Sequence, residues 1–239
     1  MLFESRNVTA GTNIQSLSPL ALYMIGRMHG PFAWRDRLIG TIDQGLRTLA
    51  SHASPGRPSP ADTLDEPSLS DDERRLSGAL LRVNHAGEIA AQALYSGQAL
   101  VARSEETRAH LQAAADEEHD HLAWCAERLA ELGGRASFLD PFWYFGSFCI
   151  GVVAGSWSDR SSLGFVVETE RQVEAHLHDH LERLPKRDQK SHAILSRMAS
   201  DEAHHGTMAS LAGGTPLPAP IRSCMALGGG VLRRIALIV

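Results

Sequence analysis

One pattern of glutamate and histidine occurs twice in this chain, and it limits the folds that the chain can adopt. Glu118 is followed by His121, and Glu202 is followed by His205. Residues three positions apart lie on the same face of an α-helix, so each pair can contact one metal ion. A carboxylate combined with an imidazole suits iron or manganese. The pattern therefore indicates two helices that each present a metal-binding pair.

A single glutamate precedes each pair at nearly the same distance. Glu88 lies 30 residues before Glu118, and Glu170 lies 32 residues before Glu202. Each interval fits one helix, a turn and a returning helix, so two helical hairpins would each place a lone glutamate opposite a pair. Four glutamates and two histidines in this arrangement form the di-iron carboxylate site of ferritin-like bundles. The predicted metal ligands are Glu88, Glu118, His121, Glu170, Glu202 and His205.

Helix-capping and helix-breaking residues delimit the predicted helices. Ser70 and Glu73 form a capping box that begins a helix ending near Arg103. Further helices are expected at about 104–133, 141–158, 161–184, 188–213 and 221–238, several of them ended by paired glycines or by proline. No stretch of this domain alternates with period two. The predicted fold class is all-α, a ferritin-like four-helix bundle with additional apolar membrane-facing helices.

The first part of the chain is expected to lie outside the bundle domain, which would cover residues 70–239. Residues 1–30 carry no periodic apolar pattern and no secretory signal, so we expect a poorly ordered extension. A short amphipathic helix is predicted from apolar residues at helical spacing, namely Leu38, Ile42, Leu46 and Leu49. Residues 51–70 contain four prolines among Ser, Asp and Gly, which indicates a linker or strap without a core of its own. Residues 1–69 are thus predicted to be an extension, a helix and a linker.

Charge and cysteine content exclude some classes of function. The formal net charge of −5 provides no global basic field, so no nucleic-acid partner is expected. The chain has three cysteines, and their odd number and wide spacing argue against a disulfide framework and indicate a reducing compartment. Each is predicted to be a small buried apolar residue: Cys125, Cys149 and Cys224.

The third carboxylate ligand has a rival on the same helix. Glu168 and Glu170 lie about 200° apart around a helix axis, so only one of them can face the bundle interior. Glu170 matches the spacing of the first hairpin better and is preferred. His119 and His204 are expected at the surface. Three residues near the inward faces could hydrogen-bond to the ligand carboxylates or simply pack between helices: His85, Tyr95 and His176.

Five short motifs occur in the order and spacing of a known family. They are LRVNHAGE at 81–88, YSGQ at 95–98, EHDHL at 118–122, PFW at 141–143 and DEAHH at 201–205. These motifs resemble those of the demethoxyubiquinone hydroxylases, and the resemblance covers about residues 70–239. One departure is Asn84, where several members of that family carry aspartate.

The resemblance implies a di-iron monooxygenase that hydroxylates a quinone ring. Its iron ligands would fall on the six residues predicted above, with Glu118 and Glu202 bridging two iron ions per subunit. The family's glutamate followed six residues later by histidine falls on Glu170 and His176, which supports Glu170 over Glu168. The substrate implied is a 2-polyprenyl-3-methyl-6-methoxy-1,4-benzoquinone or its quinol, an intermediate of ubiquinone biosynthesis. O₂ would be the cosubstrate, and NADH or the reduced substrate would supply electrons.

Two apolar stretches suggest contact with a membrane, from which a polyprenyl substrate has to be collected. Residues 141–157 carry no charge and are rich in aromatic residues, and residues 228–239 are apolar apart from Arg233 and Arg234. We expect peripheral, interfacial binding on the cytoplasmic side of the cell membrane, with a buried core helix or a membrane span as alternatives. A ubiquinone-biosynthesis complex and a homo-oligomer are further candidate partners.

Two other functions would use similar residues. One is a ferritin-like di-iron protein of another role, such as iron oxidation or peroxide disposal, which would not need the two apolar stretches. The other is a non-catalytic quinone-binding scaffold, against which the presence of all six ligands counts.

Overall fold

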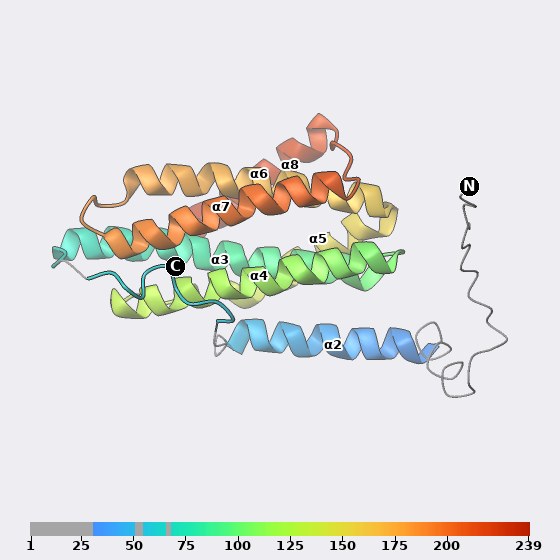
Figure 1. Cartoon of the computed structure of the whole chain (residues 1–239), viewed down its shortest axis with the longest axis horizontal. Coiled ribbons are helices and arrows are strands. Elements are labelled where there is room, and N and C mark those ends of the chain that lie inside the picture. The colour runs from blue at the N-terminus through green and yellow to red at the C-terminus, as the bar shows by residue number, and fades with distance from the viewer. Residues whose placement is uncertain (1–30, 51–54, 66–67) are drawn as a thin grey trace, which may run out of the picture. The chain divides into compact units, whose positions relative to one another are not determined.

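The computed structural model describes residues 31–50, 55–65 and 68–239, and all regular structure in these ranges is helical (Figure 1). The helices are α2 (Pro31–Ala50), α3 (Asp71–Val101), α4 (Glu105–Glu131), α5 (Asp140–Trp157), α6 (Asp159–Arg183), α7 (Gln189–Leu211) and α8 (Ala219–Ala236). This confirms the predicted all-α fold class and the ferritin-like bundle.

The chain divides into two compact units, residues 1–40 and 41–239, and helices α3 to α8 belong to the second. Helix α2 contains the apolar residues from which a short amphipathic helix was expected. The expected disordered extension, 1–30, lies outside the described residues. The expected domain boundary at residue 70 stays a prediction.

Serine side chains determine where several helices begin. The hydroxyl of Ser70 accepts a hydrogen bond from the backbone of Glu73, and the Glu73 carboxylate accepts one from the backbone of Ser70, as the capping box predicts. Ser104 caps α4, also as predicted. The predicted start of α6 near Ser161 was wrong by two residues, because the hydroxyl of Ser158 accepts from the backbone N–H of Ser161 at 3.1 Å and caps the helix earlier.

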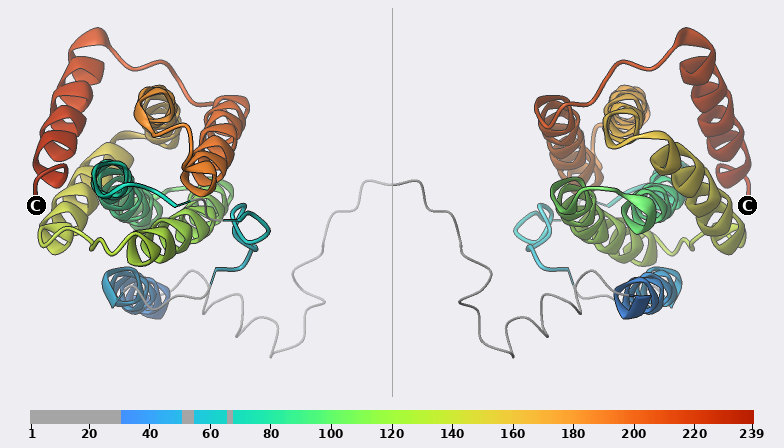
Figure 2. Two further views of the ribbon diagram at one scale, coloured as in Figure 1. Left: turned by 90° about the vertical axis from the view of Figure 1, so that its left-hand side faces the viewer. Right: turned by 90° about the vertical axis from the view of Figure 1, so that its right-hand side faces the viewer.

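Four helices form the bundle and two more cover one side of it. Helices α3 and α4 make the first hairpin, and α6 and α7 make the second; α4 contacts α7, and α3 contacts α6. The end views in Figure 2 show α5 and α8 on the same side of the bundle, where α5 packs along α3. Arg82 of α3 donates to the carbonyl oxygens of Ala236 and Leu237 at 2.8 and 3.0 Å, which fixes the end of α8.

Two apolar clusters fill the bundle, one towards each end. One contains Leu81, Trp124, Leu177, Leu195 and Met198, with other buried residues. The other contains Leu94, Tyr95, Leu111, Val166 and Ala209, again with neighbours. On each bundle helix the predicted ligands fall between the residues of the two clusters, so the polar site occupies a middle layer closed at both ends by apolar side chains.

Helices α3 and α5 approach each other at backbone distance. A Cβ atom on Gly151 would overlap the carbonyl oxygen of Leu94, and one on Gly97 would overlap the carbonyl oxygen of Phe148. Glycine is therefore required at both positions if α5 is to lie this close to α3.

The outer face of α5 carries exposed apolar residues. Its most exposed large side chains are Phe142, Phe145, Val153 and Trp157. Of the aromatic cluster at its start, Trp143 and Tyr144 turn inwards and are half-buried. Helix α8 also exposes apolar side chains, among them Leu227 and Val231. Among the described helices, none combines the length and hydropathy that a bilayer crossing requires.

The prediction that all three cysteines are buried was wrong for two of them. Cys125 is buried in the bundle core. Cys149 and Cys224 are exposed, because they lie on α5 and α8, which have only one side against the bundle. All three are free thiols.

Candidate metal centre

The structure brings the six predicted ligand residues together in the middle layer of the bundle. Helix α3 contributes one glutamate, α4 one glutamate and one histidine, α6 one glutamate, and α7 one glutamate and one histidine. All six are buried: Glu88, Glu118, His121, Glu170, Glu202 and His205. Each pair that is three residues apart projects inwards from its helix, as the helical period requires.

The ligand atoms form two overlapping groups, and within each group they lie within 4.8 Å of one another. The first group consists of Glu88, Glu118, His121 and Glu202, and the second of Glu118, Glu170, Glu202 and His205. Each group could hold one metal ion. The two glutamates that occur in both groups, Glu118 and Glu202, lie where a carboxylate can bridge two ions.

Both histidines face the shared glutamates through the same ring nitrogen. Nδ1 of His121 lies 3.0 Å from Oε2 of Glu118 and 3.3 Å from Oε1 of Glu202. Nδ1 of His205 lies 3.4 Å from Oε1 of Glu118 and 3.5 Å from Oε2 of Glu202. The two halves of the site are therefore related in geometry as well as in sequence.

The outer nitrogen of each histidine contacts a carboxylate from the opposite helix. Nε2 of His121 on α4 lies 3.1 Å from Oδ2 of Asp201 on α7. Nε2 of His205 on α7 lies 3.1 Å from Oε2 of Glu117 on α4. A carboxylate that accepts a hydrogen bond from Nε2–H fixes the tautomer and the ring orientation, so that Nδ1 is left free to bind a cation at the centre.

The electrostatics of the site show that it needs positive charge. Burial raises the pKa of Glu88 and Glu170 well above the ordinary range, and the neighbouring carboxylates raise it further. Burial opposes protonation of His205, but the carboxylates of Glu118 and Glu202, at 3.4 and 3.5 Å from Nδ1, outweigh burial and raise its pKa to about 12. Four carboxylates in one buried volume repel each other unless cations compensate them. Without a metal ion, protons bound to the histidines and to the carboxylates of Glu88 and Glu170 have to offset this repulsion.

Several buried ligand atoms have no hydrogen-bond partner, although buried polar atoms normally have one. They are Oε1 of Glu118, Oε2 of Glu170, both carboxylate oxygens of Glu202 and Nδ1 of His205. All of them belong to the two ligand groups. Hard carboxylate oxygens with one imidazole per group are a donor set that suits iron or manganese, so the residues present fit such ions.

Among the three residues expected near the ligands, only Tyr95 contacts one. Its hydroxyl donates a hydrogen bond to Oε1 of Glu170. Burial and the Glu170 carboxylate raise the pKa of Tyr95 well above its ordinary value, so the hydroxyl keeps its proton. Tyr95 therefore holds the Glu170 side chain in place.

The other two histidines make different contacts. Nδ1 of His85 lies 3.3 Å from Oδ2 of Asp140 at the start of α5. Nε2 of His176 lies 3.2 Å from Oδ1 of Asn84, the position at which several relatives were expected to carry aspartate. Both therefore pack between helices, and among the described residues neither hydrogen-bonds to a ligand carboxylate.

The structure also shows where Glu168, His119 and His204 lie. Glu170 belongs to a ligand group, whereas Glu168 points elsewhere and accepts hydrogen bonds from Arg171 and Gln172. His204 is exposed as expected, and His119 is half-buried.

Three residues around the site were missed by sequence reasoning: Glu117, Asp201 and Arg57. The first two directly precede Glu118 and Glu202, and an acidic residue beside a ligand in both halves was the available signal. Arg57 lies in the proline-rich segment, which has no helical periodicity from which a contact with the bundle could be predicted.

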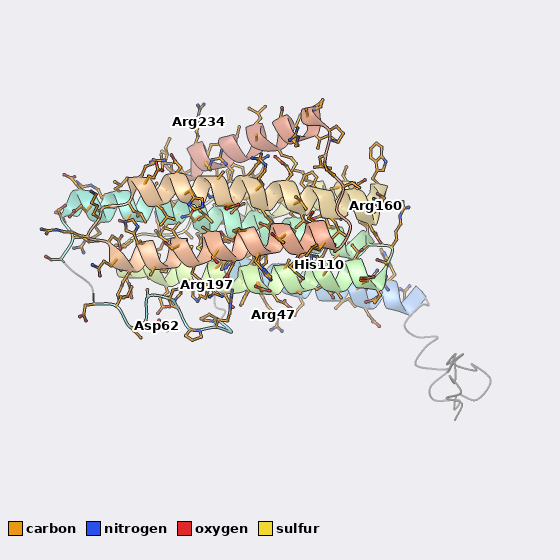
Figure 3. The ribbon with its side chains drawn as sticks, turned by 45° about the horizontal axis from the view of Figure 1, so that its top comes forward. Arg47, Asp62, His110, Arg160, Arg197 and Arg234 are labelled. Atoms are coloured by element: carbon orange, nitrogen blue, oxygen red, sulfur yellow. The ribbon has the colours of Figure 1, made fainter. Side chains whose placement is uncertain are left out.

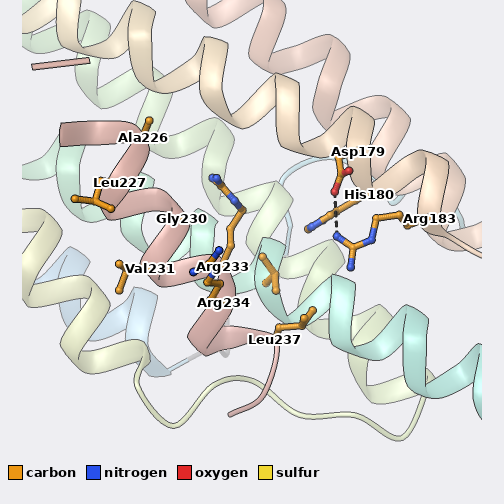
Figure 4. A pocket seen from close by; sticks show the side chains of 11 residues that line it. Asp179, His180, Arg183, Ala226, Leu227, Gly230, Val231, Arg233, Arg234 and Leu237 are labelled. Carbon is orange, nitrogen blue, oxygen red and sulfur yellow. Dashed lines mark hydrogen bonds and ion pairs between the residues drawn. The ribbon is translucent and has the colours of Figure 1, made fainter. Parts of the chain in front are cut away.

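A separate cavity of about 440 Å³ lies between α6 and α8 (Figure 4). Its lining combines apolar side chains of α8 with His180 and with three arginines, Arg183, Arg233 and Arg234. Arg183 is paired with Asp179 at 3.0 Å. None of the six ligand residues lines this cavity.

Comparison with known proteins adds independent information. The family described as "Ubiquinone biosynthesis protein COQ7" matches residues 75–232, a range that contains all five sequence motifs. A 3-demethoxyubiquinol 3-hydroxylase of Nitrosomonas eutropha is 55% identical over 201 residues, which are 84% of this chain and 97% of that protein. Proteins of the same name from Cupriavidus taiwanensis and Xanthomonas euvesicatoria are 56% and 50% identical, covering 80% and 88% of this chain and 93% and 95% of theirs.

Proposed function

Because this chain belongs to the family of the ubiquinone biosynthesis protein COQ7, we propose that it is a 3-demethoxyubiquinol 3-hydroxylase. The substrate would be the polyprenyl methoxy-benzoquinol or its quinone. In the reaction a ring C–H bond becomes C–OH. One oxygen atom of O₂ enters the product, and the other is reduced to water by two electrons and two protons, which come from NADH and a solvent proton or from the quinol.

The observation that carries this proposal is the buried pair of ligand groups that share Glu118 and Glu202. Glu88 and His121 would complete one iron position, and Glu170 and His205 the other. Two iron ions bound there would supply the activation of O₂. The protein's own residues orient both imidazoles, hold Glu170 through Tyr95 and, through the apolar clusters at both ends, exclude water from the site.

The apolar surface favours a hydroxylase of a lipid substrate over a ferritin-like protein that oxidises iron or disposes of peroxide. Such a soluble protein has no need for exposed aromatic side chains on α5 and apolar ones on α8, on the same side of the bundle (Figure 2). A non-catalytic quinone-binding scaffold would have no need for the complete ligand set.

We further propose that this side of the bundle binds the cytoplasmic face of the cell membrane. Phe142, Phe145 and Trp157 on α5 could enter the interface between head groups and acyl chains, as monotopic helices do. Two exposed free thiols, Cys149 and Cys224, suit a reducing compartment.

Complementation followed by quinone analysis tests the function. In a ubiquinone-producing bacterium that lacks its own hydroxylase, the wild-type gene should remove the demethoxy precursor and restore ubiquinone, as mass spectrometry of extracted lipids would show. Glu202→Ala should accumulate as folded protein and fail to complement, because Glu202 serves both ligand groups. Arg75→Ala, which alters an exposed ion pair with Asp72 at the start of α3, is the matched control and should complement.

The proposal would be wrong if the wild-type protein accumulated with bound metal and left the precursor unchanged. That outcome would favour a ferritin-like protein of another role.

A further inference from the structure

A short strap ahead of the bundle, residues 55–65, contacts both helices that carry the Glu-x-x-His pairs. Nε of Arg57 donates to Oδ2 of Asp120 on α4 at 2.6 Å, and its Nη1 donates to Oδ2 of Asp201 on α7 at 3.0 Å. The backbone N–H of Gly56 also donates to Asp120, at 2.6 Å. One guanidinium group therefore links α4 to α7 beside the ligand cluster.

Arg57 is held in a fixed position. Its backbone carbonyl accepts from Nε1 of Trp124 at 3.3 Å, and its guanidinium carbon lies 5.1 Å from the centre of the Trp124 ring. A planar guanidinium can stack on an aromatic ring and donate to two carboxylates from a rigid fork, whereas an ammonium group is a compact charge without that planar geometry. The side chains of Asp120 and Asp201 are only 8% and 10% exposed, so both bonds are largely shielded from water.

Arg57 reaches the metal centre through Asp201. The oxygen atom of Asp201 that accepts from Arg57 also accepts from Nε2 of His121 at 3.1 Å. Nε of Arg197, labelled in Figure 3, lies 3.0 Å from Oδ1 of Asp201 and 3.1 Å from Oδ2. The carboxylate that orients His121 is thus fixed from two sides by arginines.

The other half of the site has no such support. His205 is oriented by Glu117, whose side chain is 45% exposed. Within the described part of the chain, no arginine or lysine forms an ion pair with Glu117. The Nδ1 atoms of the two histidines therefore have matching contacts, whereas their Nε2 atoms do not. Only Asp201, which contacts Nε2 of His121, is buried and paired with arginines.

We propose that Arg57 is a positioning residue that makes the two metal positions unequal, so that the position of Glu88, Glu118, His121 and Glu202 binds its ion more tightly. This inference rests on the metal centre of the proposed function. A ligand whose orientation is fixed before binding loses less freedom when the ion arrives. The strap is thereby part of the metal site, although it belongs to neither hairpin.

Titration of the metal-free full-length protein with Co²⁺ tests this, because the visible absorption of bound Co²⁺ reports ligand geometry. The wild type should bind in two steps of different affinity. Changes to groups outside the ligands typically cost 10- to 100-fold in metal affinity, so Arg57→Ala should weaken the tighter step about tenfold and alter its spectrum. Arg57→Lys keeps the positive charge but loses the paired N–H donors of the guanidinium, so its Co²⁺ affinity should lie between those of the wild type and Arg57→Ala. Arg75→Ala should match the wild type.

Two further variants assign the step. Glu117→Ala should change the weaker step and leave the tighter one as in the wild type. In an Asp201→Asn background, Arg57→Ala should have little further effect on Co²⁺ affinity, because Arg57 acts on His121 through the Asp201 carboxylate, which that background lacks. Thermal unfolding of each metal-free variant monitors the fold, and Arg57→Lys decides the question if Arg57→Ala does not fold.

Arg57 variants with wild-type Co²⁺ affinities and spectra would overturn the inference while leaving the proposed hydroxylase intact. A wild type that binds Co²⁺ in two unequal steps, the tighter one sensitive to Arg57, but hydroxylates no quinone would overturn the proposed function alone. A wild type that binds no Co²⁺ would overturn both.

Discussion

The shared glutamates Glu118 and Glu202 contact both histidines, whereas each outer glutamate contacts one. Oε2 of Glu88 lies 3.9 Å from Nδ1 of His121, and Oε1 of Glu170 lies 3.8 Å from Nδ1 of His205. Substitution of a shared glutamate should therefore affect both metal positions, and substitution of an outer one should affect a single position first.

Glu168 and Glu170 offer a matched pair of substitutions on α6. Both are buried carboxylates two residues apart, but only Glu170 belongs to a ligand group. Glu170→Ala should lower hydroxylation at least about 100-fold, because one metal position loses a ligand. Glu168→Ala should retain most of the activity, measured as product formed by equal amounts of folded protein. Equal losses in the two variants would contradict the assignment of Glu170.

His180 makes a pH-dependent contribution to stability. Burial, with the nearby charges of His176 and Arg183, lowers its pKa to about 3 in the folded chain, against about 6.5 when unfolded. The folded state therefore excludes a proton that the unfolded state accepts below about pH 6.5. The contribution of His180 to stability is complete above that pH and is lost as the pH falls towards 3.

Replacement by a residue that does not titrate isolates this contribution. Between pH 7 and pH 5 the free energy of unfolding of the wild type should fall by about 2 kcal/mol more than that of His180→Gln. Urea unfolding of the metal-free proteins at both pH values measures the difference. An identical pH dependence in both proteins would show that His180 is not buried in its neutral form.

At the residue scale, the helical period alone predicts that Glu118 lies beside His121, and the spacing of the hairpins adds the lone glutamates. The groups that orient the histidines could not be predicted. Asp201 acts on a residue of another helix, and Arg57 acts from a segment without periodic pattern, so both contacts exist only once the bundle has folded.

At the scale of elements, α5 separates a glycine-lined inner face from an aromatic outer face. Its bounds and those of the other helices followed from caps and breaking residues to within a few positions. Its close contact with α3 could not be predicted, because the need for Gly97 and Gly151 depends on which backbone lies opposite.

Exposed aromatic residues on α5 should drive binding to lipid. Burial of a phenylalanine side chain contributes about 1.5–3 kcal/mol, so Phe142→Ser with Phe145→Ser should weaken partitioning into phosphatidylcholine–phosphatidylglycerol vesicles at least about tenfold. Leu211→Ser is the control, since Leu211 is 77% exposed but lies at the end of α7. Sedimentation with vesicles measures both. Unchanged partitioning of the double variant would refute the assignment of this face.

At the scale of the whole molecule, the candidate metal centre is the layer to which both hairpins contribute the predicted ligand residues. Each group takes residues from both hairpins, so an ion bound there links them. The spacing of the two motifs was enough to predict this pairing of hairpins. The route of the strap across α4 and α7 was not predictable, because no apolar pattern specifies it.

Metal binding should therefore stabilise the whole bundle. An ion at 100 times its dissociation constant adds about 2.7 kcal/mol to the free energy of unfolding if the unfolded chain does not bind it. Thermal unfolding with and without anaerobic Fe²⁺ should show a rise in Tm for the wild type and a much smaller one for Glu202→Ala. The same rise in both proteins would place the stabilising ion elsewhere.

The crosswise support of the histidines bears on how such a chain could arise. Each histidine is oriented by the residue just before the shared glutamate of the opposite helix, so the two hairpins serve each other in the same way. This is the relation that two copies of one hairpin have when they pair about a twofold axis, and it is what duplication of an ancestral hairpin gene would leave behind. Among the described residues the strap has no counterpart in that symmetry, and its arginine distinguishes the half of the site around His121 from the half around His205.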